Sequence, residues 1–517
     1  MLYGYSLIPP LKKGEIFMYG TWWSLVPPVV AILLALITKE VYSSLFVGVL
    51  LGALFTAGFQ PWGTFETLFT TMTESMNLNI IIFDVLLGMI IVLMTQSGGS
   101  AAYGNWASQK IKSKRASLFA TMGLGVLIFV DDYFNCLTVG SVMRPVTDKY
   151  KVSRAKLAYI IDATAAPVCI IAPISSWAAA VNSYVPKDRS LTGFQLFLRT
   201  IPYNLYALLT IGMVFVIIAW NFDFGLMKKH EMNAAKGDLF TCGAEEFESM
   251  QEDKKVNPNG KVIDLVLPVA VLIVSAVFGM IYTGYLGGAG NVIDAFANCD
   301  AEMSLIFATT VTVIFMAVLY LPRKVISFHN FMQSLAEGAK LMMPAILILT
   351  FAWTLKGMGD NLGIAEFVRS IVGTSMTASA VIPAIMFGIA LFLGFSTGTS
   401  WGTFAILVPI VVNMYAGFDD EMMIIAVSAV LAGAVCGDHV SPISDTTIMS
   451  SAGAQSNHIN HVQTQMQYAM IVAVICAIGY VIAGISKNWI ISLGSSAVIL
   501  LLTLFVISRK SRNEAAA

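Results

Sequence analysis

Two runs of hydroxyl side chains have the chemistry of a site for a small hard cation. Residues 396–400 place four hydroxyls around one glycine, and residues 441–447 add four more together with a carboxylate. Sodium prefers oxygen ligands, and the carbonyls freed where a helix unwinds supply more of them. The alternative is that these hydroxyls only bond back to their own helices. We expect Na⁺ ligands among Ser396, Thr397, Gly398, Thr399, Ser400, Ser441, Ser444, Asp445, Thr446 and Thr447.

Four further aspartates lie at or inside apolar stretches, where a charge is costly and usually functional. They are Asp131 and Asp132 at the end of the stretch 116–130, Asp162 inside 157–171, and Asp438 just before the second hydroxyl run. We expect all four to belong to the ion site. Two alternatives stay open: Asp162 forms a structural ion pair with Arg144 or Lys156, and Asp132 is an exposed residue at a helix end.

Imidazole and aromatic side chains indicate how protons or solutes would reach the site. His439 adjoins Asp438 and imidazole titrates near neutrality, although a hydrogen-bonded structural histidine is equally consistent. His458 and His461 have a metal-compatible spacing, but no cysteine or carboxylate accompanies them, so we expect interface or capping residues. The expected proton or substrate path comprises Asn135, Ser175, Ser176, Trp177, Trp401 and His439. No cofactor and no metal beyond Na⁺ is expected.

The elements that must position these residues are membrane-spanning helices. Of 517 residues, 57% are hydrophobic and 12% charged, against roughly 25% charged in soluble domains. Apolar blocks long enough to span a bilayer, which takes roughly 20 residues each, occur at 22–38, 41–58, 78–95, 201–220, 262–283, 305–321, 469–486 and 490–508. The composition predicts an all-α polytopic membrane protein. The net charge of −1 gives no reason to expect a nucleic-acid partner.

Each half of the chain also contains a region where polar, Gly- and Pro-rich pieces interrupt the apolar sequence, about 96–177 and 356–447. Irregular backbone at membrane depth persists only where protein or a water-filled cavity satisfies its polar groups. The two regions match: 172–176 reads APISS and 441–445 reads SPISD. The loop 148–154 is basic, whereas its partner 415–421 is acidic and has no Lys or Arg. By the positive-inside rule the two loops lie on opposite sides of the membrane, so we expect inverted repeats.

The same charge rule divides the chain into four parts. We expect a first half at 1–220 with the first repeat, a flexible cytoplasmic connector at 221–261, a second half at 262–508 with the second repeat, and a cytoplasmic tail at 509–517.

Other classes of membrane protein lack their signatures here. A primary pump needs a nucleotide-binding loop, and no Gly-x-x-x-x-Gly-Lys-[Ser/Thr] run occurs. An intramembrane aspartyl protease needs Gly-x-Gly-Asp, but Val435 and Cys436 precede Gly437 and Asp438. A channel has no need of two matched broken repeats, and it stays open as the more distant alternative. The sequence therefore favours a secondary transporter over an enzyme, a pump or a channel.

Five segments together resemble the NhaC family of Na⁺/H⁺ antiporters: IFVDDYF at 128–134, DATAAP with PISSW at 162–177, STGTSWGT at 396–403, GDHVSPISDTT at 437–447 and HINHVQTQ at 458–465. The resemblance implies the ion transporter superfamily fold, with re-entrant helix hairpins, a scaffold and a moving transport domain. It also implies a homodimer in a bacterial inner membrane. The connector 221–261 is longer than in a minimal family member.

Together these observations predict a Na⁺-coupled secondary active transporter, with Na⁺ as transported or coupling ion and Asp445 or Asp438 as its counter-charge. Na⁺/H⁺ antiport by alternating access is favoured. The alternative that the resemblance leaves open is Na⁺-coupled movement of an amino acid or small organic acid.

Overall fold

The computed structural model describes residues 18–516 except 39, 186–190, 242–256, 258, 293–294, 296–298, 365–366, 368–375, 416–418 and 443. Every regular element in these residues is a helix. Seven helices are long and apolar enough to cross a membrane, or up to nine if two bent pairs each count as one span. The predicted all-α, multi-pass architecture is confirmed.

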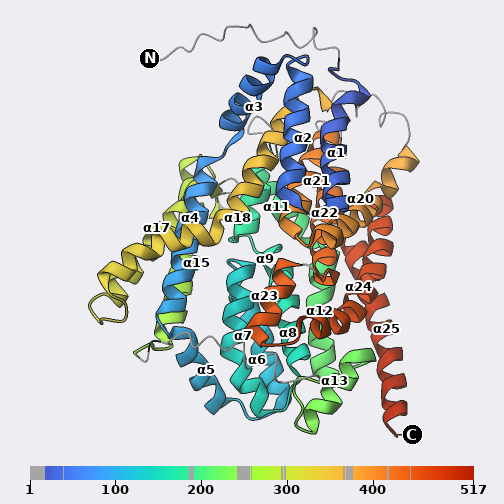
Figure 1. Ribbon diagram of the computed structural model, residues 1–517. Helices are drawn as coiled ribbons and strands as arrows, with labels where there is room; N and C mark the ends of the chain where they lie inside the picture. Colours follow the sequence, from blue (N-terminus) through green and yellow to red (C-terminus); the bar gives the residue numbers. More distant parts are fainter. Residues whose placement is uncertain are drawn as a thin grey trace.

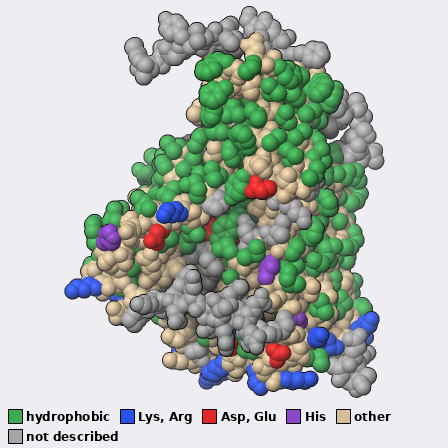
Figure 2. Space-filling model, viewed as in Figure 1, with side chains coloured by type: hydrophobic (Ala, Val, Ile, Leu, Met, Phe, Trp, Pro, Cys, Tyr) green, Lys and Arg blue, Asp and Glu red, His purple; other side chains and the backbone are tan. Residues whose placement is uncertain are grey.

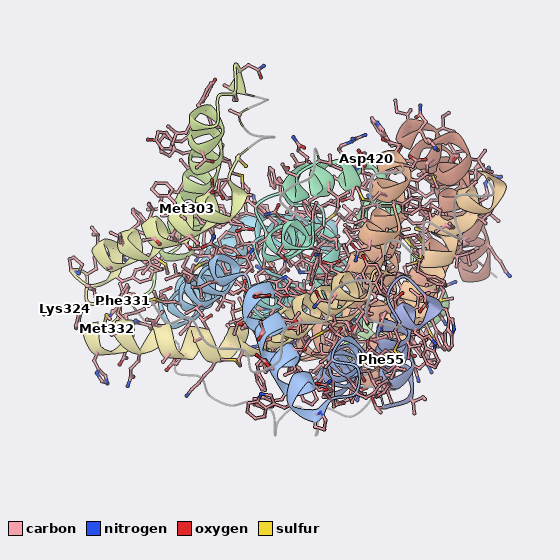
Figure 3. The ribbon with its side chains drawn as sticks, turned by 90° about the horizontal axis from the view of Figure 1, so that it is seen from above. Phe55, Met303, Lys324, Phe331, Met332 and Asp420 are labelled. Atoms are coloured by element: carbon pink, nitrogen blue, oxygen red, sulfur yellow. The ribbon has the colours of Figure 1, made fainter. Side chains whose placement is uncertain are left out.

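One group of helices forms a peripheral bundle along one side and the top of the molecule (Figure 1). It comprises η1 (Trp22–Leu25), α1 (Val26–Thr38), α2 (Val41–Thr56), α3 (Pro61–Ser75), α4 (Leu78–Gln96), α15 (Ile263–Leu286), α17 (Ala301–Tyr320) and α18 (Phe328–Asn361). Helix α4 contacts both α17 and α18, and a Cβ on Gly88 would lie 2.3 Å from the carbonyl oxygen of Gly338. Seen from above, α17 and α18 extend outward, with Lys324 and Met332 near their far end (Figure 3).

The remaining helices form the central bundle. From the first half come α5 (Gly99–Lys110), α6 (Lys114–Leu127), α7 (Asp132–Lys149), α8 (Arg154–Ala163), α9 (Ala166–Cys169), α10 (Ser176–Ser183), α11 (Gly193–Thr200), η2 (Ile201–Tyr203), α12 (Leu205–Trp220) and α13 (Gly225–Ala235). From the second half come α20 (Met376–Thr397), α21 (Ser400–Met414), α22 (Asp420–Val440), α23 (Asp445–Ala454), α24 (His458–Ser486) and α25 (Trp489–Ala516). Helix α22 lies in the core, because every residue from Met422 to Val440 is buried.

The predicted interruptions fall where helices break. Residues 128–131 separate α6 from α7, residues 170–175 separate α9 from α10, Gly398 and Thr399 separate α20 from α21, and 441–444 separate α22 from α23. Gly398 has φ +69°, a left-handed conformation that favours glycine. Two stretches expected to be irregular are mostly helical: 99–106 belongs to α5, and α18 continues to Asn361.

Helices that adjoin breaks in the two halves of the chain pack against each other. Helix α23 contacts both α7 and α8. The approach of α7 is closest at Gly140, where a Cβ would lie 2.4 Å from the carbonyl carbon of Gly453. Small residues let helices in a membrane approach this closely. Helix α23, from the second half, is thus seated among first-half helices.

Helix α13 belongs to the segment expected to be a flexible connector, and its fold corrects that expectation. Met227, His230, Glu231 and Ala234 are buried. Glu231 lies 2.6 Å from Lys114 Nζ and accepts from the Ser153 backbone N–H at 2.8 Å. The connector therefore begins as a helix held against the ends of α6 and α8.

Glu231→Gln should lower the stability of the protein by about 1–2 kcal/mol, the scale for a buried, hydrogen-bonded charge whose partner, Lys114, is partly exposed. Burial alone would raise the pKa of Glu231, but Lys156 and Lys114 outweigh it and hold the pKa below its usual range. A carboxyl with a lowered pKa stabilises the fold above its unfolded pKa, and this contribution disappears as the pH falls through the folded pKa. Thermal unfolding in detergent at pH 7 and pH 4 should show the variant's deficit shrinking at the lower pH. Glu74→Gln, at an exposed position, is the control; an equal deficit in both variants contradicts the prediction.

Candidate ion site

Asp438 lies where the two hydroxyl runs meet. Its Oδ2 accepts from Ser400 Oγ at 2.7 Å and from Thr446 Oγ1 at 3.0 Å. Asp438 is fully buried, and each hydroxyl residue is 1% exposed. The carboxylate comes from the last turn of α22, while the hydroxyls come from the first turns of α21 and α23. Ser444 Oγ lies 3.1 Å from Thr446 Oγ1, which brings a third hydroxyl into the cluster.

Several of the other predicted ligands perform structural roles. Thr399 caps α21 by accepting from the Gly402 N–H, and Ser444 caps α23 by accepting from the Thr447 N–H. Thr397 donates to the Leu393 carbonyl at 2.9 Å, and Ser441 donates to the Phe395 carbonyl at 2.7 Å. Ser396 is buried beside the turn. Asp445 begins α23, but its side chain is outside the described residues.

The break between α6 and α7 forms the first-half counterpart. Asp131 and Asp132 are both buried, which excludes the exposed alternative for Asp132. Ser176 Oγ donates to Asp131 Oδ2 at 3.3 Å, and the Ser176 N–H donates to the Val130 carbonyl at 3.0 Å. The break is thereby held against the N-terminus of α10.

Asn135 also bonds to the backbone at this break. Its Nδ2 donates to the carbonyls of Gly125, Ile128 and Thr164 at 2.7, 2.8 and 3.0 Å. Such carbonyls lose their helical donors at a break and need replacements. Ser175 likewise caps α10, accepting from the Ala178 N–H. Both residues were predicted on the transport path, and in the structure both bond to backbone atoms at helix breaks or helix ends.

Asp162 lies at a second cluster, where a hydroxyl and an amide donate to it and Lys156 does not pair with it. Its Oδ2 accepts from Thr447 Oγ1 at 2.9 Å and from Gln465 Nε2 at 2.6 Å. Lys156 pairs instead with Asp223 at 2.6 Å. Because Thr446 donates to Asp438 and Thr447 to Asp162, consecutive hydroxyls on α23 serve two different carboxylates.

Two imidazoles flank Asp162. His439 Nε2 lies 3.7 Å from Oδ1, and His461 Nε2 lies 3.8 Å from Oδ2. His439 Nδ1 is 3.2 Å from the Tyr206 hydroxyl. The expectation that His461 is an interface or capping residue is wrong, since its side chain is fully buried. The sequence analysis also missed Gln465 and Tyr206; the only available signal was that His461 and Gln465, four residues apart, share one helix face.

The two predicted aromatic walls lie together in the core. The rings of Trp177 and Trp401 are 5.5 Å apart between centroids, and Phe404 packs against both. Both indole N–H groups are buried, and neither has an acceptor among the described residues. Neither ring lines the large cavity described next.

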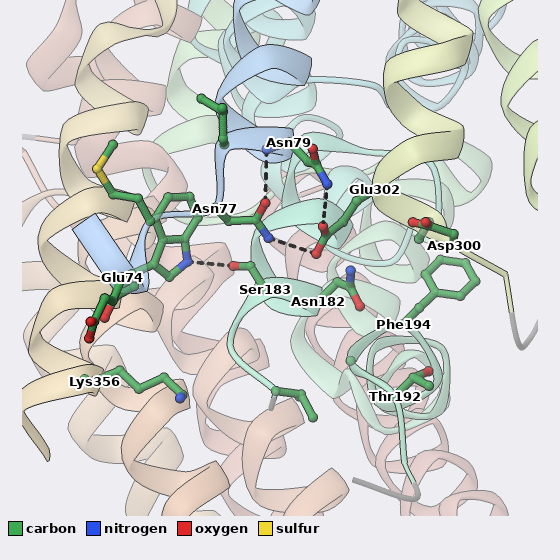
Figure 4. Close-up of a pocket in the computed structure, with 18 of the residues that line it drawn as sticks. Glu74, Asn77, Asn79, Asn182, Ser183, Thr192, Phe194, Asp300, Glu302 and Lys356 are labelled. Carbon is green, nitrogen blue, oxygen red and sulfur yellow. Dashed lines mark hydrogen bonds between the residues drawn. The ribbon is translucent and has the colours of Figure 1, made fainter. Parts of the chain in front are cut away.

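A cavity of about 790 Å³ opens between the peripheral and central bundles (Figure 4). Its walls come from the ends of α3, α10 and α18 and the beginnings of α4, α11 and α17. Among the residues that the structure describes, four carboxylates line it, Glu74, Asp300, Glu302 and Asp360, against one lysine, Lys356. Asn77 and Asn79 donate to Glu302 at 2.8 and 3.2 Å, while Lys356 pairs with Asp360 at 2.9 Å.

Comparison with known families identifies the class of protein. A model of the Na⁺/H⁺ antiporter family matches residues 187–485, more than half of the chain. The chain belongs to this family. Its members are transporters, so this antiporter-family protein is a Na⁺-coupled transporter rather than an enzyme.

Relatives of this antiporter-family chain extend the comparison. An uncharacterized protein of Haemophilus influenzae is 37% identical over 94% of this chain and 96% of its own length. An uncharacterized Na⁺/H⁺ antiporter of the same organism is 29% identical over 31% of this chain and 34% of its own. A malate-2H⁺/Na⁺-lactate antiporter of Bacillus subtilis is 26% identical over 33% and 36%.

Two solved structures are distantly similar. The YdaH transporter of Alcanivorax borkumensis gives a TM-score of 0.49 at 12% identity, covering 82% of this chain and 89% of YdaH. MtrF of Neisseria gonorrhoeae, described as one of a class of antimetabolite efflux pumps, gives 0.46 at 13% identity over 80% and 82%.

Proposed function

We propose that this protein exchanges Na⁺ for H⁺ across a bacterial inner membrane by alternating access, with Na⁺ bound at Asp438. The observation that carries the proposal is the buried Asp438 carboxylate, which Ser400 and Thr446 approach from two different helix N-termini. A carboxylate with hydroxyl oxygens suits a hard cation. Burial makes the charged form of a carboxylate costly, and a bound cation would stabilise it.

The break between α6 and α7 and the break between α20 and α21 would belong to the two inverted repeats. Helices α6 and α7 lie in the lower part of the molecule, and α20 and α21 lie in the upper part (Figure 1). Lys and Arg side chains gather at the lower end in the same view (Figure 2). Helices α5, α6 and α13 lie at this end (Figure 1), and Lys112 and Arg115, near the start of α6, and Lys151, after α7, are exposed. We assign this end to the cytoplasm by the positive-inside rule. The acidic loop 415–421 would then face outward, although 416–418 are outside the described residues.

The peripheral bundle would form the scaffold against which the central bundle moves. Apolar side chains on α15 and α17, such as Val274 and Val318, are 68% and 69% exposed, which suits contact with lipid or with a second copy in a homodimer.

Na⁺-coupled movement of an organic solute is the second candidate. Its support is the cavity of about 790 Å³, a size typical of small-molecule sites. The four carboxylates around it favour a cation or a zwitterion such as an amino acid over a dicarboxylate. The named substrates of the Bacillus relative are carboxylates, which such a lining would repel.

Proteoliposomes containing a pH-sensitive dye distinguish the two candidates. Na⁺ is added outside vesicles that contain the purified protein, with no organic solute present. The lumen should become more alkaline, because H⁺ leaves as Na⁺ enters. If proton movement requires an added amino or organic acid, the second candidate replaces the first. If ²²Na⁺ does not enter under any of these conditions, both candidates are wrong.

A further inference from the structure

A chain of hydrogen-bonding groups links the half-buried His458 to Asp162. His458 Nδ1 lies 3.1 Å from Ser451 Oγ, which lies 2.9 Å from His461 Nδ1. His461 Nε2 lies 2.9 Å from Gln465 Oε1, and Gln465 Nε2 donates to Asp162 Oδ2. These groups come from α8, α23 and α24, and none of them is needed to explain the cluster at Asp438.

The two ends of this chain fix the direction of its hydrogen bonds. Gln465 Nε2 lies 2.6 Å from Asp162 Oδ2 and 2.7 Å from the His439 carbonyl. Two such acceptors orient the amide so that Oε1 must accept from His461 Nε2. At the other end, His458 Nε2 lies 2.7 Å from the Pro442 carbonyl, which only accepts, so this nitrogen donates.

Counting hydrogens shows that the chain holds one titratable proton. Four contacts run from the Pro442 carbonyl to Gln465 Oε1, through His458, Ser451 and His461. Two neutral imidazoles and one hydroxyl supply only three hydrogens. All four contacts are satisfied only when one imidazole is protonated on both nitrogens. In the neutral chain one contact is lost, and Ser451 Oγ has the Thr447 carbonyl at 2.8 Å as another acceptor.

Burial opposes a proton on His461, and the neighbouring Asp162 is the charge that favours it. The carboxylate of Asp162, from α8, lies 3.8 Å from His461 Nε2, and opposite charges at this distance stabilise the charged form. His439 on α22 and His458 on α24 are the other titratable groups that act on it. Cys136 on α7 contacts α23 through Ser450 at 3.1 Å. His461 is buried and His458 is half-buried, so the chain leads from the surface at the start of α24 into the core.

We propose that the transported proton travels through His458, Ser451 and His461 to Asp162, on a site separate from the Na⁺ site at Asp438. In the last step His461 Nε2 gives up its hydrogen bond to Gln465 and transfers the proton to Asp162 Oδ2, 3.8 Å away. This inference rests on the proposed Na⁺/H⁺ exchange. It assigns the two cargoes to two carboxylates rather than to competition for one. The geometry that carries it is the shared Ser451 hydroxyl, which lies within hydrogen-bonding distance of both imidazoles and can donate to only one.

The test measures two activities on the same proteoliposomes. ²²Na⁺/Na⁺ exchange needs no proton, whereas Na⁺-driven pH change does. His461→Gln should retain ²²Na⁺/Na⁺ exchange and lose Na⁺-driven proton movement by about a hundredfold, the scale for removing a proton-transfer group. Ser451→Ala, which keeps every titratable group, should show the same split. His329→Gln, at an exposed histidine on α18, is the matched control and should resemble the wild type in both activities.

The outcomes separate this relay from the function on which it rests. A wild-type protein that moves no protons with Na⁺ overturns the proposed exchange itself. A wild type that does, with both variants unchanged, overturns the relay alone. Loss of both activities together in Ser451→Ala also overturns it, because that result assigns the chain a purely structural role. If His461→Gln is not obtained as folded protein, Ser451→Ala decides the question.

Discussion

Asp438→Asn should weaken Na⁺ binding strongly while leaving the helices in place. Asparagine keeps the size of the side chain and can still accept from Ser400 and Thr446, but it deletes the charge that faces the ion. The loss of a charged partner is worth about 1.5–3 kcal/mol, which corresponds to roughly a 10- to 100-fold weaker dissociation constant. Isothermal titration of detergent-purified protein with NaCl measures it, and circular dichroism verifies the helical content.

The controls for this variant lie on the same part of the chain. Asp420→Asn alters an exposed aspartate at the opposite end of α22 and should bind Na⁺ as the wild type does. Asp445→Asn tests the other residue that the sequence offered as counter-charge. If Asp438→Asn binds Na⁺ normally and Asp445→Asn does not, the counter-charge is Asp445 and the assignment to Asp438 is wrong.

Gly437→Ala should destabilise the protein by about 3 kcal/mol, the upper end of the range for an overpacked core. A Cβ at this position would lie 2.1 Å from the Leu391 carbonyl oxygen and 2.7 Å from the Phe395 nitrogen. Both are backbone atoms of α20, so the strain cannot be relieved by moving a side chain. Helices α20 and α22 would have to separate, which also displaces Asp438 from Ser400. We expect a lower melting temperature in detergent and weaker Na⁺ binding.

Gly388→Ala, on α20 itself, is the matched substitution. Nothing lies within 4 Å of a Cβ at Gly388, and alanine is favoured over glycine within a helix by about 1 kcal/mol. Its melting temperature should be unchanged or higher. Equal melting temperatures for the two variants would contradict the close approach of the two helices.

The sequence alone predicted the class of fold and the positions of most helix breaks. Both follow from local composition: apolar length predicts a span, and Ser, Gly and Pro in the middle of a span predict a break. The two hydroxyl runs were recognised on the same basis, and the structure brings one member of each, Ser400 and Thr446, to Asp438.

Contacts between distant segments were beyond this kind of reasoning. Asp162 and Gln465 are separated by 303 positions, and only the packing of α23 and α24 against α8 brings them together. The same limit explains why His461 was misinterpreted, because its carboxylate neighbour is absent from its own segment. Helix α13 was missed for a related reason: its polar sequence folds because Glu231 meets Lys114 from another helix.

Consecutive threonines on α23 connect the two carboxylates mechanically. Thr446 and Thr447 point to Asp438 and Asp162 from one helical turn, with side chains about 100° apart around the axis. A rigid turn cannot rotate to strengthen one of these hydrogen bonds without disturbing the other. If Na⁺ alters the affinity of Asp162 for protons through this turn, protons must alter the affinity of Asp438 for Na⁺ by the same factor, because binding linkage is reciprocal. The first turn of α23 would thus couple the Na⁺ site and the proton site through two single hydroxyl groups.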